Sequence, residues 1–400
     1  MSKRVGGFIN QDGLNAPDPA TGVSASAGDA QADVSFTAPA DVGGSAITGF
    51  VATSDDGIGA TGPSSPITVS GLSNGTAYTF RVWALNAFGY SAPSDASGSV
   101  SPSAPRGVFA GGTTTGAAAS NTIDYITFAG GNAIDFGDLT TATSSMSAGC
   151  GSATRGLLAA VGSSSRNSNI NFITFATTGN ASSFGNLGRS LIYNCGCSND
   201  VRGLFAGGVA FAAHFNNIDY VTIATTGSSL DFGDLLLGLT QLGATAGATR
   251  GIFAGGVDGT PTNVDTVQFV TIASTGNATD FGDLTTGRGG GPAGAASDTR
   301  AVFAGGTDGS FANTNIIDYV TIASAGNAID FGDLPLATTF KAGCSNTVSG
   351  FFGGGTGGGA TVNTINRVTI ATTGNAFDFF DLTSVRTELS AASNAHGGLS

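Results

Sequence analysis

Charged side chains are scarce in this sequence: they make up 10% of its 400 residues, against roughly 25% in an ordinary soluble domain. Lys and Arg together number 14 and Asp and Glu 27, which gives a net charge of −13. Nucleic acid is bound by clustered Lys and Arg that neutralise phosphates. The balance of charge therefore argues against a nucleic-acid partner.

Long apolar segments are also missing. The most apolar run, LLLGL at 235–239, falls far short of the ~20 residues that cross a bilayer, so we expect no membrane insertion. The basic start MSKRVGG is not followed by an apolar segment. We therefore expect no secretory signal, and synthesis in a cytoplasm.

Cysteine and histidine occur four times and twice. Four cysteines give little basis for a disulfide framework, and His214 and His396 are too few for a copper centre or a histidine-based hydrolase. The sequence thus predicts no metal, no cofactor and no catalytic residue in a non-enzymatic protein. Two alternatives stay open, namely weak calcium binding by Asp- and Asn-rich loops and a catalytic carboxylate pair among the 27 acids.

Glycine, by contrast, is abundant, with 65 copies, as in proteins built from short strands and tight turns. Within residues 16–104, Tyr78, Phe80, Val82 and Ala84 alternate with more polar residues, which predicts a strand with one buried face. Several such runs are separated by Gly, Pro, Asp and Asn. This region is predicted to be a β-sandwich.

The segment GLSNGTAYTFRVWALNAFGYSAPS at 71–94 resembles the second half of a fibronectin type III domain. Leu72 matches the leucine before that family's corner, and Tyr78 matches the corner tyrosine. Phe36 stands where the family has an early tryptophan. The resemblance implies an Ig-like sandwich over 16–104 that serves as a spacer or adhesive module.

The remaining boundaries follow from composition. SPSAP at 101–105 is predicted to be a linker, because its two prolines disfavour continued strand pairing. Residues 1–15 are expected to be a docking segment, and residues 105–400 a separate β-domain.

One motif recurs through that β-domain: an apolar strand followed by glycines, as in RGIFAGG. Its first residues are spaced 47 to 50 residues apart. They are Arg106, Arg155, Arg202, Arg250, Arg300 and Ser349. A period in this range is typical of propeller blades or a solenoid.

The third copy illustrates the predicted unit. Its four expected strands are 194–199, 203–208, 218–224 and 229–235, and four antiparallel strands per unit is the arrangement of a β-propeller. We expect a short Thr-Thr-Gly-Ser turn between the last two strands, in which Gly227 is able to take positive φ. Cys150, Cys197 and Cys344 stand five residues before the repeat start and are predicted to be small buried residues.

The repeat resembles the kelch repeat: a hydrophobic strand ending in Gly-Gly, an aromatic strand flanked by aspartate, a turn and a closing aromatic. Phenylalanine stands where kelch has tryptophan, at Phe136, Phe184, Phe232, Phe281, Phe331 and Phe379. The resemblance implies that the glycines let neighbouring sheets pack closely.

The first copy lacks its first strand, and SAASN at 390–394 aligns with that strand in the other copies. The C-terminal strand should therefore complete the first sheet and leave no spare edge. The predicted fold is all-β, a fibronectin type III sandwich followed by a six-bladed kelch-like β-propeller closed by the C-terminal strand.

The five arginines at one repeat position have two interpretations. They could form a ring that binds an anion, or they could pair with the repeat aspartates. The aspartates concerned are Asp124, Asp219 and Asp318 of IDY and Asp138, Asp234, Asp283 and Asp333 of FGD. A residue needed in every copy is more often structural, and we favour that role.

What differs between the copies is the better guide to binding. The loops between second and third strands should share one face with the connections between sheets, by strand alternation. Aromatic residues are frequent there, at Phe211, His214, Phe215, Tyr193 and Phe311. Such side chains suit contact with sugar or protein. The alternative is that they fold back onto their own sheet.

The N-terminal SKRVGGFINQDGLNAP and both modules resemble a virion structural protein of a tailed bacteriophage, in the style of marine and cyanobacterial phages. The resemblance implies a tail fibre, appendage or capsid-decoration protein, located in the virion in multiple copies. Other virion proteins would be bound through residues 1–15, with the sandwich as a further candidate contact, and a host-surface glycan or protein through the propeller. The alternatives are a propeller enzyme acting on glycans and a bacterial surface adhesin.

Overall fold

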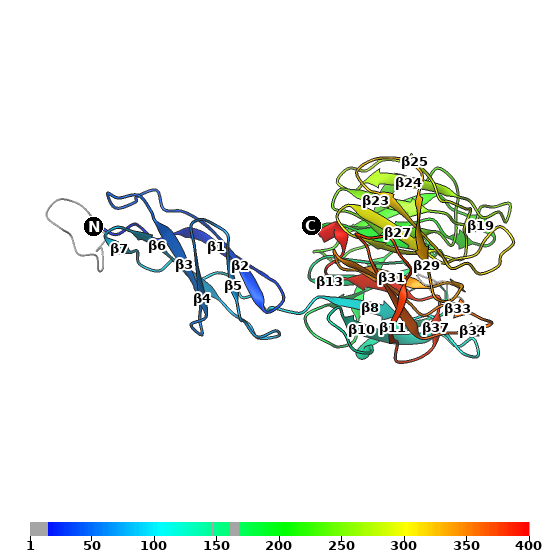
Figure 1. The fold of residues 1–400 in the computed structure, drawn as a ribbon, viewed down its shortest axis with the longest axis horizontal. Coiled ribbons are helices and arrows are strands. Elements are labelled where there is room, and N and C mark those ends of the chain that lie inside the picture. Colours follow the sequence, from blue (N-terminus) through cyan, green and yellow to red (C-terminus); the bar gives the residue numbers. More distant parts are fainter. Residues whose placement is uncertain (1–14, 146–147, 161–167, 400) are drawn as a thin grey trace. The chain divides into compact units, whose positions relative to one another are not determined.

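The computed structural model describes residues 15–145, 148–160 and 168–399, and these fold into two compact units divided between Ala104 and Pro105 (Figure 1). The expected docking segment at 1–15 falls almost wholly outside the described residues. The described chain is all-β apart from one 3₁₀ turn, η1 (Gly397–Leu399). Over the same residues, no helix is long and apolar enough to cross a membrane.

The first unit contains two antiparallel sheets. The three-stranded sheet has the order β1-β2-β5 and the bounds β1 Thr21–Ala27, β2 Gln31–Thr37 and β5 Ile67–Ser70. The four-stranded sheet has the order β4-β3-β6-β7 and the bounds β3 Gly49–Ser54, β4 Gly59–Gly62, β6 Phe80–Asn86 and β7 Gly89–Tyr90.

The core of this unit lies between the inner faces of the two sheets. Tyr78, Phe80, Val82 and Ala84 are all buried, which confirms the predicted alternation. The backbone N–H of Ser73 donates to the Tyr78 hydroxyl at 3.0 Å, the local bond expected of a corner tyrosine.

The free edge of β6 is covered by an irregular segment rather than by a full strand. Ser91, Ser94 and Ser97 recur every third residue there, and each accepts a backbone N–H of β6 on its hydroxyl, at 2.9–3.0 Å. Each also donates its own N–H to a β6 carbonyl. The three serines thus satisfy an edge that would otherwise be open to pairing with another chain.

The second unit contains six four-stranded antiparallel sheets, which we number in chain order. Sheet 1 comprises β38 Ser390–Ser393, β8 Arg106–Ala110, β10 Ser120–Thr127 and β11 Ile134–Thr143. Sheet 2 comprises β12 Gly149–Gly151, β13 Arg155–Ala160, β14 Asn169–Thr174 and β15 Ser182–Asn186. Sheet 3 comprises β16 Cys195–Ser198, β17 Arg202–Ala206, β20 Asn217–Thr222 and β21 Leu230–Asp234.

Sheet 4 comprises β22 Gly243–Ala246, β23 Arg250–Ala254, β24 Thr266–Thr271 and β25 Thr279–Asp283. Sheet 5 comprises β26 Ala293–Ala296, β27 Arg300–Ala304, β28 Ile316–Thr321 and β29 Ile329–Asp333. Sheet 6 comprises β31 Ala342–Ser345, β32 Ser349–Gly353, β35 Thr364–Thr369 and β36 Phe377–Asp381. Two-residue strands lie in the loops: β9 Thr113–Thr114, β18 Val209–Ala210, β19 Ala213–His214, β30 Thr338–Thr339, β33 Thr356–Gly357, β34 Ala360–Thr361 and β37 Arg386–Thr387.

The predicted repeat is confirmed at the level of strands. The second strand of every sheet begins at the expected residue, from Arg106 in β8 to Ser349 in β32. The predicted pairing of the C-terminal segment with the first copy is also confirmed, because β38 pairs antiparallel with β8, Ser390 opposite Ala110 and Ser393 opposite Gly107. Sheet 1 is thus assembled from the two ends of this unit.

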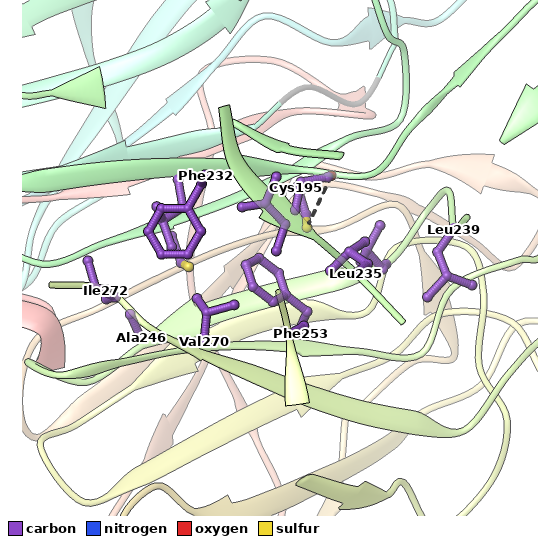
Figure 2. Close-up of a cluster of buried hydrophobic side chains, with 14 residues drawn as sticks. Cys195, Phe232, Leu235, Leu239, Ala246, Phe253, Val270 and Ile272 are labelled. Atoms are coloured by element: carbon purple, nitrogen blue, oxygen red, sulfur yellow. Dashed lines mark hydrogen bonds between the residues drawn. The ribbon is translucent and has the colours of Figure 1, made fainter. Parts of the chain in front are cut away.

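Consecutive sheets are joined by apolar clusters. Figure 2 shows the cluster between sheets 3 and 4, in which Phe232 and Cys195 of sheet 3 meet Phe253 and Val270 of sheet 4. An equivalent cluster joins sheet 6 to sheet 1. The first strands also contact one another in succession, β12 with β16, β16 with β22, β22 with β26, β26 with β31, β31 with β38 and β38 with β12.

Main-chain hydrogen bonds connect the outer strands of consecutive sheets. Within β11, the carbonyl of Asp138 accepts the N–H of Ala181 of sheet 2 at 2.8 Å. The same bond recurs at each following boundary, and the carbonyl of Asp381 in sheet 6 accepts the N–H of Ala133 in sheet 1 at 2.9 Å. The boundary between sheets 6 and 1 is therefore bonded like the other five.

Glycines occupy the positions where the sheets approach most closely. A Cβ at Gly203 would lie 2.7 Å from the Cys150 sulfur, and one at Gly207 would lie 2.6 Å from the Leu239 carbonyl. The second glycine, Gly208, has φ 110° and Gly207 has φ 65°, so the pair also needs left-handed backbone. The close approach of the sheets was predictable from sequence, whereas the left-handed backbone of the glycine pair was not.

The turn before β21 does not place Gly227 in left-handed backbone, a conformation that the sequence allowed but did not require. The Gly227 N–H instead donates to the Phe184 carbonyl of sheet 2 at 2.9 Å, and its own carbonyl lies where a Cβ on Gly185 would be. The turn is shaped by contact with the preceding sheet rather than by the hairpin alone.

Removing residues 390–400 tests the role of β38. We expect the free energy of unfolding to fall by ~2 kcal/mol or more, and Tm to fall by roughly 4 °C or more, because β8 loses its partner and its edge is exposed. Calorimetry would measure Tm and size-exclusion chromatography would detect aggregation. A synthetic peptide of residues 388–400 should restore Tm, whereas unchanged melting of the truncated chain would contradict the prediction.

Candidate functional site

The loops between second and third strands lie beside the connections between sheets. β9 pairs with β37, β33 pairs with β30, and single bridges join Ile192 to Val209, Thr240 to Val257 and Gly289 to Thr307. We call this combined surface the connection face. The equivalent loop of the second copy falls largely at 161–167, outside the described residues.

Two of the five candidate aromatic residues are exposed at loop tips of the connection face. Phe211 lies at the tip of the β18–β19 hairpin, is 84% exposed and has φ 49°. Phe311 occupies the corresponding loop of the fifth copy, is 52% exposed and has φ 60°. A bulky residue in left-handed backbone is uncommon, and here it holds an apolar ring toward solvent.

The next two candidates are held against the protein. His214 Nδ1 lies 3.1 Å from the carbonyl oxygen of Val257 in the next copy. Phe215 is half-buried, and the Arg189 guanidinium carbon lies 5.2 Å from its ring centroid. The alternative raised from sequence, that loop aromatics fold back, therefore describes Phe215.

The fifth candidate, Tyr193, belongs to a different cluster. Its hydroxyl donates to Glu388 Oε1 at 3.1 Å, and its ring stacks on Phe340 with centroids 6.1 Å apart. Thr113 donates its hydroxyl to Glu388 Oε2 at 3.0 Å. Sequence reasoning missed Glu388 and Phe340, although each stands two residues before a first strand, as Tyr193 does.

These residues form a hydrogen-bonded series before the first strands. Tyr193, Gln241, Phe340 and Glu388 all have φ between 55° and 59°. The N–H of Gln241 donates to the Tyr193 carbonyl at 3.0 Å, and that of Glu388 donates to the Phe340 carbonyl at 3.2 Å. Burial raises the pKa of the Glu388 carboxyl, and burial together with the nearby Glu388 charge raises the pKa of Tyr193 to about 12.

The repeat arginines are structural, but they do not pair with the repeat aspartates. Each guanidinium stacks on the aromatic residue of the third strand, as Arg250 does on Phe269 at 4.6 Å. Each also donates to a main-chain carbonyl of the next sheet, as Arg250 does to Ile322 at 2.8 Å. The arginines thus join consecutive sheets.

Two other arginines, both from connections, pair with repeat aspartates inside the protein. Arg288 donates to Asp318 Oδ2 at 2.8 Å and Arg386 donates to Asp124 Oδ2 at 2.5 Å, and all four side chains are fully buried. Burial lowers the pKa of both arginines, and the facing aspartates oppose that shift. Neither arginine was singled out from sequence, because neither stands at the repeat position.

In sheet 4, neutral residues occupy the positions of both the aspartate and the connection arginine. There Gln268 replaces the aspartate and accepts the N–H of Leu236 at 2.8 Å, as Asp318 accepts the N–H of Thr285. Leu239 takes the place of the connection arginine, since its carbonyl accepts the N–H of Gly208 as that of Arg288 accepts the N–H of Gly256. The chain thus offers both a charged and a neutral version of one contact.

All four cysteines are free and buried, as expected for the three at repeat-equivalent positions. Burial raises the pKa of the Cys197 thiol to about 12, which disfavours the thiolate, the nucleophilic form of cysteine. Within the described ranges, no group of three His, Cys, Asp or Glu side chains is placed to hold a metal ion.

Comparison with known proteins identifies one part of the chain. The fibronectin type III domain family matches residues 17–99, which agrees with the two sheets and the corner tyrosine of the first unit. The match includes none of the six sheets of the second unit. No curated protein matches the sequence.

The buried pairs give a stability prediction with a control drawn from the chain itself. Arg288→Leu should lower the free energy of unfolding by about 3 kcal/mol or more, because Asp318 is left buried without its counter-charge. Adding Asp318→Gln, which copies Leu239 and Gln268 of sheet 4, should recover most of that loss. Chemical denaturation measures both, and an equal loss in the single and double variants would contradict this account.

Glu388 gives a prediction of pH dependence. The pKa of its carboxyl is higher in the folded than in the unfolded protein. Its contribution to the free energy of unfolding is therefore most favourable below the pKa of the unfolded state, and is lost as pH rises through the pKa of the folded state. Glu388→Gln keeps an acceptor for Tyr193 without the charge. This variant should melt above the wild type at pH 7, and the difference should shrink at acidic pH. A constant difference across the pH range would count against the prediction.

Proposed function

We propose that this chain, a fibronectin type III domain followed by six like sheets, is a non-enzymatic structural protein of a tailed-phage virion. In this proposal residues 105–400 form a closed six-bladed β-propeller of kelch-like type. Support for closure comes from the pairing of β38 with β8, from the apolar cluster between sheets 6 and 1, and from the Asp381–Ala133 hydrogen bond across that boundary.

The observation that carries the binding role is the exposure of Phe211 and Phe311 on the connection face. Aromatic rings are the side chains that most often dominate contacts with protein, and their faces also stack on sugars. The repeated residues, by contrast, contact the neighbouring sheets. Specificity would then reside in the loops that differ between copies, with a host-surface glycan or protein as ligand.

The proposed role in the particle combines this face with an attachment at the other end of the sequence. Residues 1–15, and the sandwich as a further contact, would bind other virion proteins, in a tail appendage or a capsid decoration. The protein would be present in multiple copies. Mass spectrometry of purified particles, with a density map that locates the two units, tests this directly, and absence of the chain from the particles would overturn the proposal.

The binding role is tested by Phe211→Ser with Phe311→Ser. On a printed array of bacterial surface polysaccharides, we expect the double variant to lose affinity for any bound glycan by roughly thirtyfold, because truncating a central interface aromatic removes ~2 kcal/mol or more. Its Tm should stay within a degree or two of the wild type, since neither ring is buried.

Ile329→Ser is the matched control. Ile329 is 58% exposed on the fourth strand of sheet 5, away from the loop tips, and its loss should leave glycan binding unchanged. Early melting of the double variant would show that the rings support the fold instead. Release of reducing ends from the array would favour the alternative of a glycan-cleaving enzyme.

A further inference from the structure

A cavity of about 420 Å³ lies where the connection after sheet 2 meets the outer strands of sheet 3. Three carboxylates line it, those of Asp219, Asp231 and Asp234, together with Asn217, Ser229 and the Gly188–Arg189 corner. Its volume is in the range of pockets that accept small ligands or side chains.

The residue that makes this cavity unusual is Asp219. It occupies the repeat position of Asp124 and Asp318, and each of those carboxylates receives a buried guanidinium from the connection before its sheet. Each also receives a threonine hydroxyl, from Thr383 or Thr285, at 2.7 Å. The chain therefore shows twice which cation this position accepts.

Around Asp219 both partners are replaced. Leu191 stands two residues before Tyr193, where Arg386 stands two residues before Glu388, and Gly188 replaces the threonine. The hydrogen bonds that Asp219 accepts from described residues come from the Gly188 N–H at 3.1 Å and the Ser229 hydroxyl at 2.9 Å, both at Oδ2. Asp219 thus lacks the arginine that its counterparts have.

The nearby arginine does not substitute for the missing one. Arg189 borders the cavity, but its guanidinium is exposed and stacks on Phe215. The cavity therefore has three carboxylates and one guanidinium directed to another contact. Its net charge favours a cationic ligand.

The shape of the site favours an extended cation over a compact one. A metal ion would need its carboxylates gathered around one point, and the described residues contain no such group of three. A guanidinium is planar, carries five N–H donors and can bind carboxylates through two parallel hydrogen bonds. We propose that this cavity binds a guanidinium group, presented by an arginine side chain of a partner protein.

The proposal does not depend on a virion role or on closure of the six sheets, and it is tested with the isolated full chain. The probes are N-acetyl-arginine amide, its lysine counterpart, and N-acetyl-citrulline amide, which has the shape of arginine without the charge. Backbone amide NMR shifts measure the dissociation constant. We expect the arginine probe to shift residues 217–219 and 229–234, and to bind about tenfold or more tightly than citrulline.

Two variants locate the binding. Asp219→Asn should weaken arginine binding about tenfold or more, and Leu191→Arg should do the same by supplying the guanidinium from within the chain. Asp280→Asn, which removes one exposed charge from sheet 4, is the matched control and should have no effect. Undiminished arginine binding by Asp219→Asn would overturn the proposal, and so would equal affinity for citrulline or for lysine.

Discussion

The second unit depends on the close approach of neighbouring sheets. A Cβ at Gly149 would lie 2.1 Å from the Ala391 carbonyl and one at Gly343 would lie 2.2 Å from the Gly294 carbonyl, so the first strands pack almost backbone against backbone. This contact leaves no room for a side chain at these positions of the first strands, which are therefore occupied by glycine. Charged side chains join the sheets elsewhere, through the repeat arginines and the two buried ion pairs.

The boundary between sheets 6 and 1 meets this constraint with different residues. Phe380 stands where the other fourth strands have glycine. Ser349 stands where the other five second strands begin with arginine. Arg367 compensates from the third strand: it donates to the Ser349 hydroxyl at 3.1 Å and stacks on Phe379 at 5.1 Å. The cation–aromatic contact is thus kept while the strand that supplies the cation changes.

The features predictable from sequence were those that repeat. Six similar starts, five of them ending in Gly-Gly, specified the strands and the pairing of 390–394 with β8, because the copies can be aligned with one another. Features that depend on the third dimension were not predictable. Arg288 and Asp318 are 30 residues apart and share no motif. Phe211 and Ala212, both with positive φ, form the two-residue turn between β18 and β19, and no glycine marks that turn in the sequence. Tyr193 was selected as an aromatic loop residue, but its partners come from 147 and 195 residues further along the chain.

Most of the described cations of the second unit are used inside the protein. Five repeat arginines donate to carbonyls between sheets, Arg288 and Arg386 are buried in ion pairs, and Lys341 donates to the Gly354 carbonyl in a site where burial lowers its pKa to about 7. Because these cations are engaged internally, few cations remain on the described surface of the second unit, where Arg189 is exposed among acids, amides, hydroxyls and a few aromatic rings. Long-range attraction of an anionic ligand is disfavoured on such a surface. Such a surface suits the two proposed ligands, a neutral group that stacks on the exposed rings and a guanidinium that binds Asp219.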